Sequence, residues 1–161
     1  MRFRSLLAAV AAFLAFTLSA TAQEDGPWRA ASTNARAITG DVIFSPLKVT
    51  INFTTFTIAQ IRLLKTEEVL ALFNPDSPTG GGNIFRVDIP ADKRFLHKNT
   101  LCGSESTQWI VTYAQGRDLH IALFSGATVP VLTVDALNDA LALAGILEER
   151  LRTALDLNES P

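Results

Sequence analysis

Apolar and polar residues alternate in short runs through the middle of the chain. In the first run, Val49, Ile51 and Phe53 alternate with polar residues. Similar runs recur at residues 56–64, 84–89, 109–114 and 119–123. A period of two places every second side chain on one face of a β-strand, so that one face meets a core and the other meets solvent. We therefore predict half-buried strands at these positions.

Turn-forming residues separate several of these runs. The sequence QGRD at residues 115–118 lies between two runs, and Gly116 has the freedom of φ that a tight hairpin needs. The stretch Asn74–Asn83 holds two prolines and three consecutive glycines. We predict a β-hairpin at the first stretch and a mobile loop at the second.

Residues 67–73 fit two different structures. Thr66 followed by Glu67 and Glu68 is typical of the start of a helix. The apolar residues that follow are also typical of a strand that is buried on both faces. The neighbouring strands favour a strand, which is our prediction, and a helix is the alternative.

The C-terminal segment carries a helical pattern. Apolar residues recur there at helical spacing: Leu137, Leu141, Ala144, Leu151 and Leu155. Asp135 suits the N-cap position, because its carboxylate can accept a free backbone N–H. We predict an amphipathic helix over about residues 136–156 that packs through one face.

Together these elements predict a mainly β protein with about seven or eight short strands and one C-terminal helix. Sequential hairpins indicate an antiparallel sheet, which either closes into a barrel or folds as a sandwich. Residues 23–161 suffice for a single globular domain with its own core.

The N-terminal residues 1–22 have the pattern of a secretory signal peptide. Arg2 and Arg4 are followed by the apolar run Leu6–Leu18 and by the small residues Ser19–Ala22. The apolar run is shorter than the roughly 20 residues that cross a bilayer. We therefore predict cleavage after Ala22 and a periplasmic or secreted chain without a membrane anchor.

The charge of the chain disfavours two classes of partner. Of 14 basic and 16 acidic residues, two basic ones lie in the predicted signal peptide, so 12 − 16 leaves a net charge of −4 on residues 23–161. The basic residues are also scattered along the chain. Nucleic-acid binding and polybasic contact with a membrane surface both need clustered positive charge, and we predict neither.

Cys102 is the only cysteine of the chain. A single cysteine cannot form an internal disulfide, so the fold must be stable without one. Free cysteine is among the most buried residue types, and we predict a small apolar side chain in the core. An intermolecular disulfide or a reactive thiol in the loop around Gly103 is the alternative.

Residues that carry catalytic or metal chemistry are sparse. His97 and His120 lie 23 positions apart, and Asp118 precedes His120 by two, whereas a structural metal site normally takes four ligands. Cys102, His120 and Asp118 form a nucleophile–base–acid set on paper, but no hydrolase motif surrounds them. The glycines of Thr79–Asn83 lack the Lys-Ser/Thr of a phosphate-binding loop. We predict no catalytic residue, no metal and no cofactor.

Gly26-Pro27-Trp28 near the predicted mature N-terminus resembles the G-x-W sequence that opens the first strand of lipocalin-like (calycin) β-barrels. The chain length, the export signal, the run of antiparallel strands and the later helix agree with that resemblance. It implies that Trp28 packs under the closed end of a barrel and that an arginine near the last strands, such as Arg117, covers it. From the residues alone, Trp28 is a core anchor of a β-fold.

These observations favour an exported, soluble, non-enzymatic binding module. An eight-stranded barrel can hold one small apolar ligand, and this is the first form of the hypothesis. The alternative is a module that binds another exported protein through its loops, as an enzyme inhibitor or accessory subunit does, chiefly through Asn74–Asn83 and Ala91–Ser106.

Overall fold

The computed structural model describes residues 24–144 and 154–159. Within these ranges the strands are β1 (Gly26–Ala30), β2 (Val42–Ser45), β3 (Lys48–Ile51), β4 (Thr54–Thr57), β5 (Ala59–Leu63), β6 (Gly81–Ile89), β7 (Thr107–Gln115), β8 (Asp118–Ser125) and β9 (Ala154–Glu159). The helices are α2 (Thr33–Ile38), α3 (Thr66–Phe73), the short 3₁₀ helix η2 (Leu96–Lys98) and α4 (Val134–Ala144). The predicted signal peptide lies outside the described residues.

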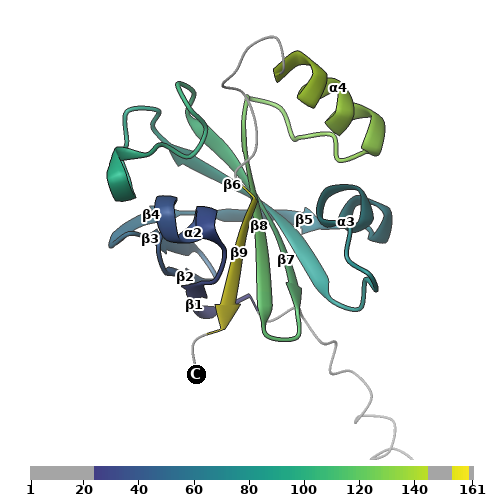
Figure 1. The fold of residues 1–161 in the computed structure, drawn as a ribbon, viewed down its shortest axis with the longest axis horizontal. Coiled ribbons are helices and arrows are strands. Elements are labelled where there is room, and N and C mark those ends of the chain that lie inside the picture. The colour runs from purple at the N-terminus through teal and green to yellow at the C-terminus, as the bar shows by residue number, and fades with distance from the viewer. Residues whose placement is uncertain (1–23, 145–153, 160–161) are drawn as a thin grey trace, which may run out of the picture.

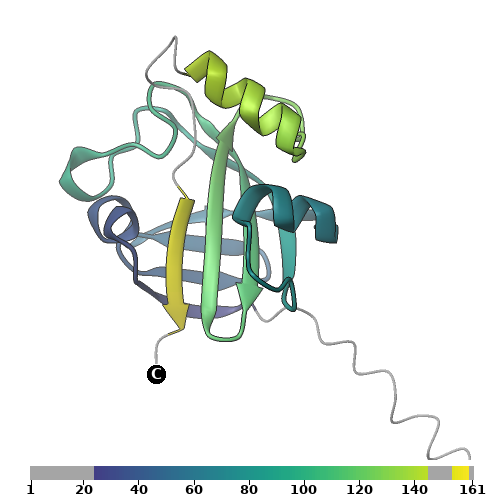
Figure 2. The ribbon, with the colours of Figure 1, turned by 45° about the vertical axis from the view of Figure 1, so that its right-hand side comes forward.

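All described strands belong to one antiparallel sheet with the order β4-β3-β2-β1-β9-β8-β7-β6-β5. The first four strands form one meander, β5–β8 form a second, and β9 joins them by pairing with β1 and β8. Figures 1 and 2 show the strands of the first meander running across those of the second. The expected mainly β, antiparallel architecture is therefore confirmed, with β4 and β5 as the two ends of the strand order instead of a closed barrel.

The sheet ends β4 and β5 are consecutive in the chain. Only Ile58 separates them, and its side chain is buried in the inner core. Its backbone N–H donates to Leu47 O in the turn between β2 and β3, at 2.9 Å. This residue thus marks the point at which the chain leaves one meander and enters the other.

Two hydrophobic clusters hold the two meanders and the helices together. The inner cluster includes residues of both meanders, among them Trp28, Phe44, Val49, Ile58, Phe85, Ile110, Leu119 and Leu123. The outer cluster lies between the second meander and the helices α3 and α4, and includes Leu72, Ile84, Trp109, Val111, Phe124 and Leu137. Strands β6–β8 are thus buried on both faces, because α3 and α4 cover their outer side (Figure 2).

Helix α3 replaces the strand that we expected over residues 67–73. Its first turn carries Glu67 and Glu68, and the Glu68 carboxylate accepts a hydrogen bond from Lys65 N at 2.9 Å. Acidic residues at a helix N-terminus accept hydrogen bonds from free N–H groups and interact favourably with the positive end of the helix dipole. The helix signal was therefore correct, and the strand prediction was wrong because it relied on the neighbouring strands.

The glycine-rich stretch is only in part a loop. Gly81, Gly82 and Asn83 belong to β6 and pair with β7. A Cβ atom on Gly80 would lie 1.9 Å from Ala114 O, and one on Gly82 would lie 2.4 Å from Thr112 O. The glycines are needed because two backbones approach closely, which corrects the prediction of a mobile loop up to Asn83.

The predicted hairpin around Gly116 is confirmed, with Gln115 opposite Asp118 and Gly116 at φ 61°. The described part of the C-terminal helix is α4, Val134–Ala144. It begins at Val134, with Thr133 Oγ1 accepting from Ala136 N at 3.3 Å, so Thr133 takes the capping role that we assigned to Asp135.

The predicted helix also extended too far. Residues 145–153 lie outside the described residues, and Ala154–Glu159 form strand β9 instead of a last helical turn. The pairing of β9 with β1 and β8 satisfies its backbone groups on both sides, which local helical spacing could not reveal.

Candidate functional site

A tight turn joins β3 to β4 and presents an aromatic side chain to solvent. Ile51 pairs with Thr54, so the loop consists of Asn52 and Phe53 alone. Their φ values are 44° and 62°, as in a type I′ hairpin turn. Phe53 is 98% exposed, whereas Val49 and Ile51 of the same alternating run are buried. The sequence predicted Phe53 in the strand; the chain turns one residue before it.

Phe53 occupies a backbone conformation that costs free energy. Left-handed backbone costs a residue with a side chain about 1–2 kcal/mol, and type I′ turns prefer Asn-Gly. Asn52 suits the first position, but Phe53 stands where glycine would relieve the strain. No core contact compensates, because nearly all of the ring faces water. Strain of this kind concentrates at functional sites.

A cavity of about 390 Å³ opens beside this turn, on the outer side of β1–β3, and we call it the hairpin pocket. Its lining comes from β1, β2, β3, the β3–β4 turn, the end of α2 and the loop around η2. The lining residues are apolar (Pro27, Trp28, Ile43, Phe53, Leu96), polar or charged (Arg29, Thr39, Asp41, Thr50, Asn52), and Gly40.

A second left-handed segment lies next to the same pocket. His97 and Lys98 follow the pocket residue Leu96 and have φ values of 54° and 65°. The side chains of His97 and Asn99 both contact Ala37 O, with His97 Nδ1 at 3.1 Å and Asn99 Nδ2 donating at 3.0 Å. These contacts anchor the loop to the end of α2.

The strained residues of the described chain thus gather at one place. Its non-glycine residues with positive φ are Asn52, Phe53, Asn74, His97 and Lys98. Asn74 is the left-handed C-cap of α3, a common role for asparagine. Of the other four, Asn52 and Phe53 line the hairpin pocket, and His97 and Lys98 are the two residues after its lining residue Leu96.

The pocket wall also carries two charges of opposite sign. Arg29 lies on β1 and Asp41 precedes β2, and both are exposed. Asp41 Oδ1 accepts a hydrogen bond from Ala30 N at 2.9 Å, which fixes this carboxylate beside the end of β1. The pocket therefore combines an apolar surface with a fixed anionic group and a cationic group.

A buried carboxyl group lies elsewhere, on the inner side of the sheet. Glu24 is 5% exposed, and its Oε1 accepts from Asn83 Nδ2 at 2.8 Å and from Thr112 Oγ1 at 2.5 Å. Gln60 in turn donates to Asn83 Oδ1. Trp28 is buried in the inner cluster, as the sequence predicted, and its indole N–H donates to Glu24 O at 2.8 Å.

Burial raises the pKa of Glu24 above its ordinary value of 4.5, because the charged form loses water. The hydrogen bonds from Thr112 and Asn83 lower the pKa, and the charge of Asp25 raises it. The described partners of the Glu24 carboxyl group are an amide and a hydroxyl that also hold β6 and β7 together, so its role is structural.

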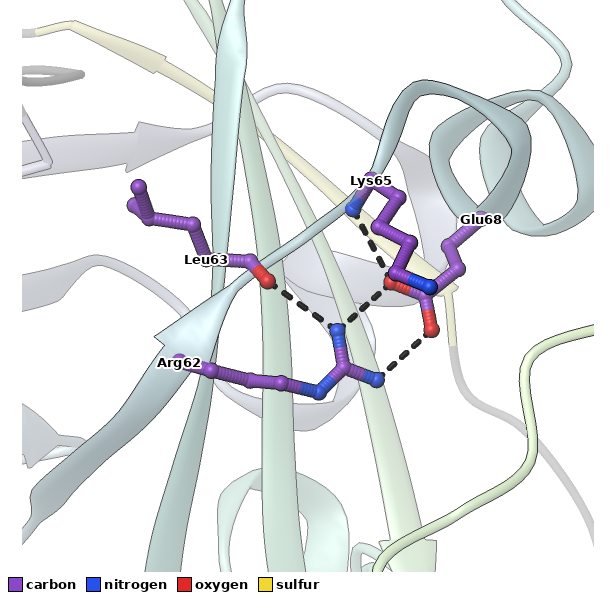
Figure 3. Close-up of polar contacts among 4 residues, drawn as sticks. All are labelled: Arg62, Leu63, Lys65 and Glu68. Atoms are coloured by element: carbon purple, nitrogen blue, oxygen red, sulfur yellow. Dashed lines mark hydrogen bonds and ion pairs between the residues drawn. The ribbon is translucent and has the colours of Figure 1, made fainter.

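A bidentate ion pair supports the start of α3 (Figure 3). Arg62 Nη1 and Nη2 lie 2.6 Å from Glu68 Oε2 and Oε1, and Arg62 Nη1 also donates to Leu63 O at 3.0 Å. The Arg62 guanidinium holds the pKa of Glu68 below its ordinary value. Through Arg62, the Glu68 carboxylate links the start of α3 to strand β5.

The sequence-derived nucleophile set is not assembled. Cys102 packs against the inner cluster and is half-buried, and burial raises the pKa of its thiol. His120 lies on the outer side of β8, where its ring stacks on Tyr113 at 5.9 Å between centroids and contacts Phe73. Asp118 is exposed at the β7–β8 turn. The thiol and the imidazole thus lie on opposite sides of the sheet.

Two further residues named in the sequence analysis, His97 and Arg117, lie outside any catalytic or metal-binding arrangement in the described structure. His97 contacts Ala37 O, and Arg117 is exposed in the β7–β8 turn. Among the residues that the structure describes, no group of three or more His, Cys, Asp and Glu side chains is arranged to hold a metal ion. Within the same residues, none of the helices has the length and apolar character needed to span a bilayer.

Comparisons with known proteins return no match to a family model, to a curated protein or to a solved structure. The lipocalin-like resemblance therefore stays a prediction.

Proposed function

We propose that the chain is an exported, non-enzymatic binding module that engages a protein partner through the hairpin pocket and Phe53. The observation that carries this proposal is the 98% exposed Phe53 ring at a strained, two-residue turn. A ring held on a short hairpin loses little freedom on binding, and buried aromatic side chains are frequent energetic centres of protein interfaces.

Two features favour a protein partner over a ligand inside the β-structure. The inner cluster is filled by side chains, and Val49, Leu119, Ile110 and Leu123 in it are at most 1% exposed. The hairpin pocket opens at the outer surface instead, next to a side chain that projects from it. We further propose that the two meanders face each other as a sandwich across this filled core.

Site-specific photo-crosslinking tests the proposal. A photoreactive phenylalanine analogue is placed at position 53 of the full-length chain, expressed in its source organism and irradiated in intact cells. The matched control carries the analogue at Leu47, which is 67% exposed at the opposite end of the β2–β3 hairpin. We expect a discrete crosslinked protein from position 53 and none from position 47. Equal or absent crosslinking at both positions contradicts the proposal.

The size of the pocket favours a second candidate, a small ligand with an apolar body. Its volume of about 390 Å³ lies within the range of small-molecule sites. Native mass spectrometry of the gently purified chain distinguishes the two. A discrete extra mass that is lost on denaturation, and that Ile43→Arg abolishes, supports the small ligand.

A further inference from the structure

We infer that one partner of the hairpin pocket is a second copy of this chain, with Phe53 of each copy inserted into the pocket of the other. This inference rests on the proposed function of the same site and names its partner. The geometry points to it because the projecting ring and the pocket belong to one surface patch.

A two-fold contact requires a patch that is complementary to itself. Phe53 is both a lining residue of the pocket and a projecting group beside it. A cavity of about 390 Å³ has room for one phenyl ring, because sites of this size hold whole small molecules. Ile43, 49% exposed, offers the incoming ring an apolar wall. Association would bury both rings and would cover both pockets.

The charges of the patch are also self-complementary. Arg29 and Asp41 line the same pocket from neighbouring strands. A two-fold axis through the patch lets Arg29 of one copy face Asp41 of the other, twice per dimer. Asp41 is already oriented by its hydrogen bond from Ala30 N, so less side-chain freedom is lost when the pair forms. The net negative charge of the chain opposes association, and these local pairs of opposite charge act against that repulsion.

Sedimentation velocity over a wide range of protein concentrations tests the inference. The protein is purified from cells that express the full sequence, with reductant present so that Cys102 cannot link two chains. We expect a reversible monomer–dimer equilibrium. Phe53→Ala should raise the dimer dissociation constant about 30-fold or more, which is the scale of losing an aromatic hot spot. Leu47→Ala is the matched control and should leave it unchanged.

A charge reversal tests the register of the two copies. Arg29→Glu places an acidic group opposite Asp41 of the other copy and should weaken the dimer. A mixture of Arg29→Glu chains with Asp41→Lys chains restores both pairs of opposite charge and should form a heterodimer that is more stable than the homodimer of either variant. A monomer at every concentration, or a dimer that Phe53→Ala leaves intact, overturns the inference. Position 53 crosslinking to a different protein would then still support the proposed function, so the two failures can be told apart.

Discussion

Thr112 Oγ1 donates a 2.5 Å hydrogen bond to Glu24 Oε1, across 88 residues of sequence. The bond ties the segment before β1 to the centre of β7. Asn83 donates to the same oxygen from β6. A carboxyl group with little access to water thus links the segment before β1 to the second meander, and we expect its contribution to stability to depend on pH.

Glu24→Gln should stabilise the protein at neutral pH by about 1 kcal/mol or more, because it removes a buried charge that burial penalises. The folded-state pKa of Glu24 is raised, so the stabilising effect of its protonated form is present in full below the ordinary carboxyl pKa and is lost as the pH rises through the raised pKa. Wild-type stability should therefore fall over that window, and the variant should lack this loss.

Urea unfolding as a function of pH measures this effect. Asp92→Asn, which alters an exposed carboxylate, is the control and should follow the wild-type curve. A Glu24→Gln variant that is less stable than the wild type at pH 7 would show that the ionised carboxylate is the stabilising form.

Glu68→Gln should cost about 0.5–1 kcal/mol at neutral pH, because it removes the charge from a bidentate pair whose arginine is partly exposed. The lowered pKa of Glu68 means that this contribution is present above the ordinary carboxyl pKa and is lost as the pH falls through the lowered pKa. Glu67→Gln, at the exposed neighbouring position, is the matched control. If both variants lose equal stability, the effect belongs to the helix terminus and not to the pair.

Gly80→Ala should destabilise the fold by about 2–3 kcal/mol, because its Cβ would collide with the rigid backbone oxygen of Ala114. Gly116→Ala is the comparison, with φ 61° and open space around the new methyl group, and should cost only about 1 kcal/mol. Thermal unfolding of the two variants gives the order. A Gly80→Ala cost no larger than that of Gly116→Ala would mean that β6 can move away from β7.

Cys102 should react with a thiol reagent much more slowly in the folded protein than in urea. The thiol is half-buried against the inner cluster, and burial raises its pKa, so little thiolate is present at neutral pH. Equal rates in both states would mean that the thiol is accessible in the folded chain.

The sequence predicted those elements whose signals are local. The β7–β8 hairpin was found because alternation on both sides of Gly116 fixes the register. Helix α3 was signalled by Thr66 and its two glutamates, but the neighbouring strands were given more weight. Strand β9 could not be found, because its strand character arises from pairing with β1 and β8, which are distant in sequence.

The candidate site was missed for a related reason. Alternation extends one residue too far, so Phe53 looks like a third inward side chain after Val49 and Ile51. Only Asn52, a residue that tolerates left-handed backbone, signalled the turn. Glu24 was unremarkable in sequence, because its burial depends on Asn83 and Thr112 from distant strands.

We propose that Phe53 is kept exposed and in a strained backbone conformation for binding. Equilibrium unfolding of Phe53→Gly at a protein concentration low enough to keep the chains monomeric tests whether the turn is strained, with Phe53→Ala as the variant that removes the ring but keeps the strain. We predict that Phe53→Gly is more stable than the wild type by about 0.5–1.5 kcal/mol, as relief of left-handed strain exceeds the entropy cost of glycine, and that Phe53→Ala is nearly neutral. A Phe53→Gly variant less stable than the wild type would overturn this proposal, because the ring would then contribute to the stability of the fold itself.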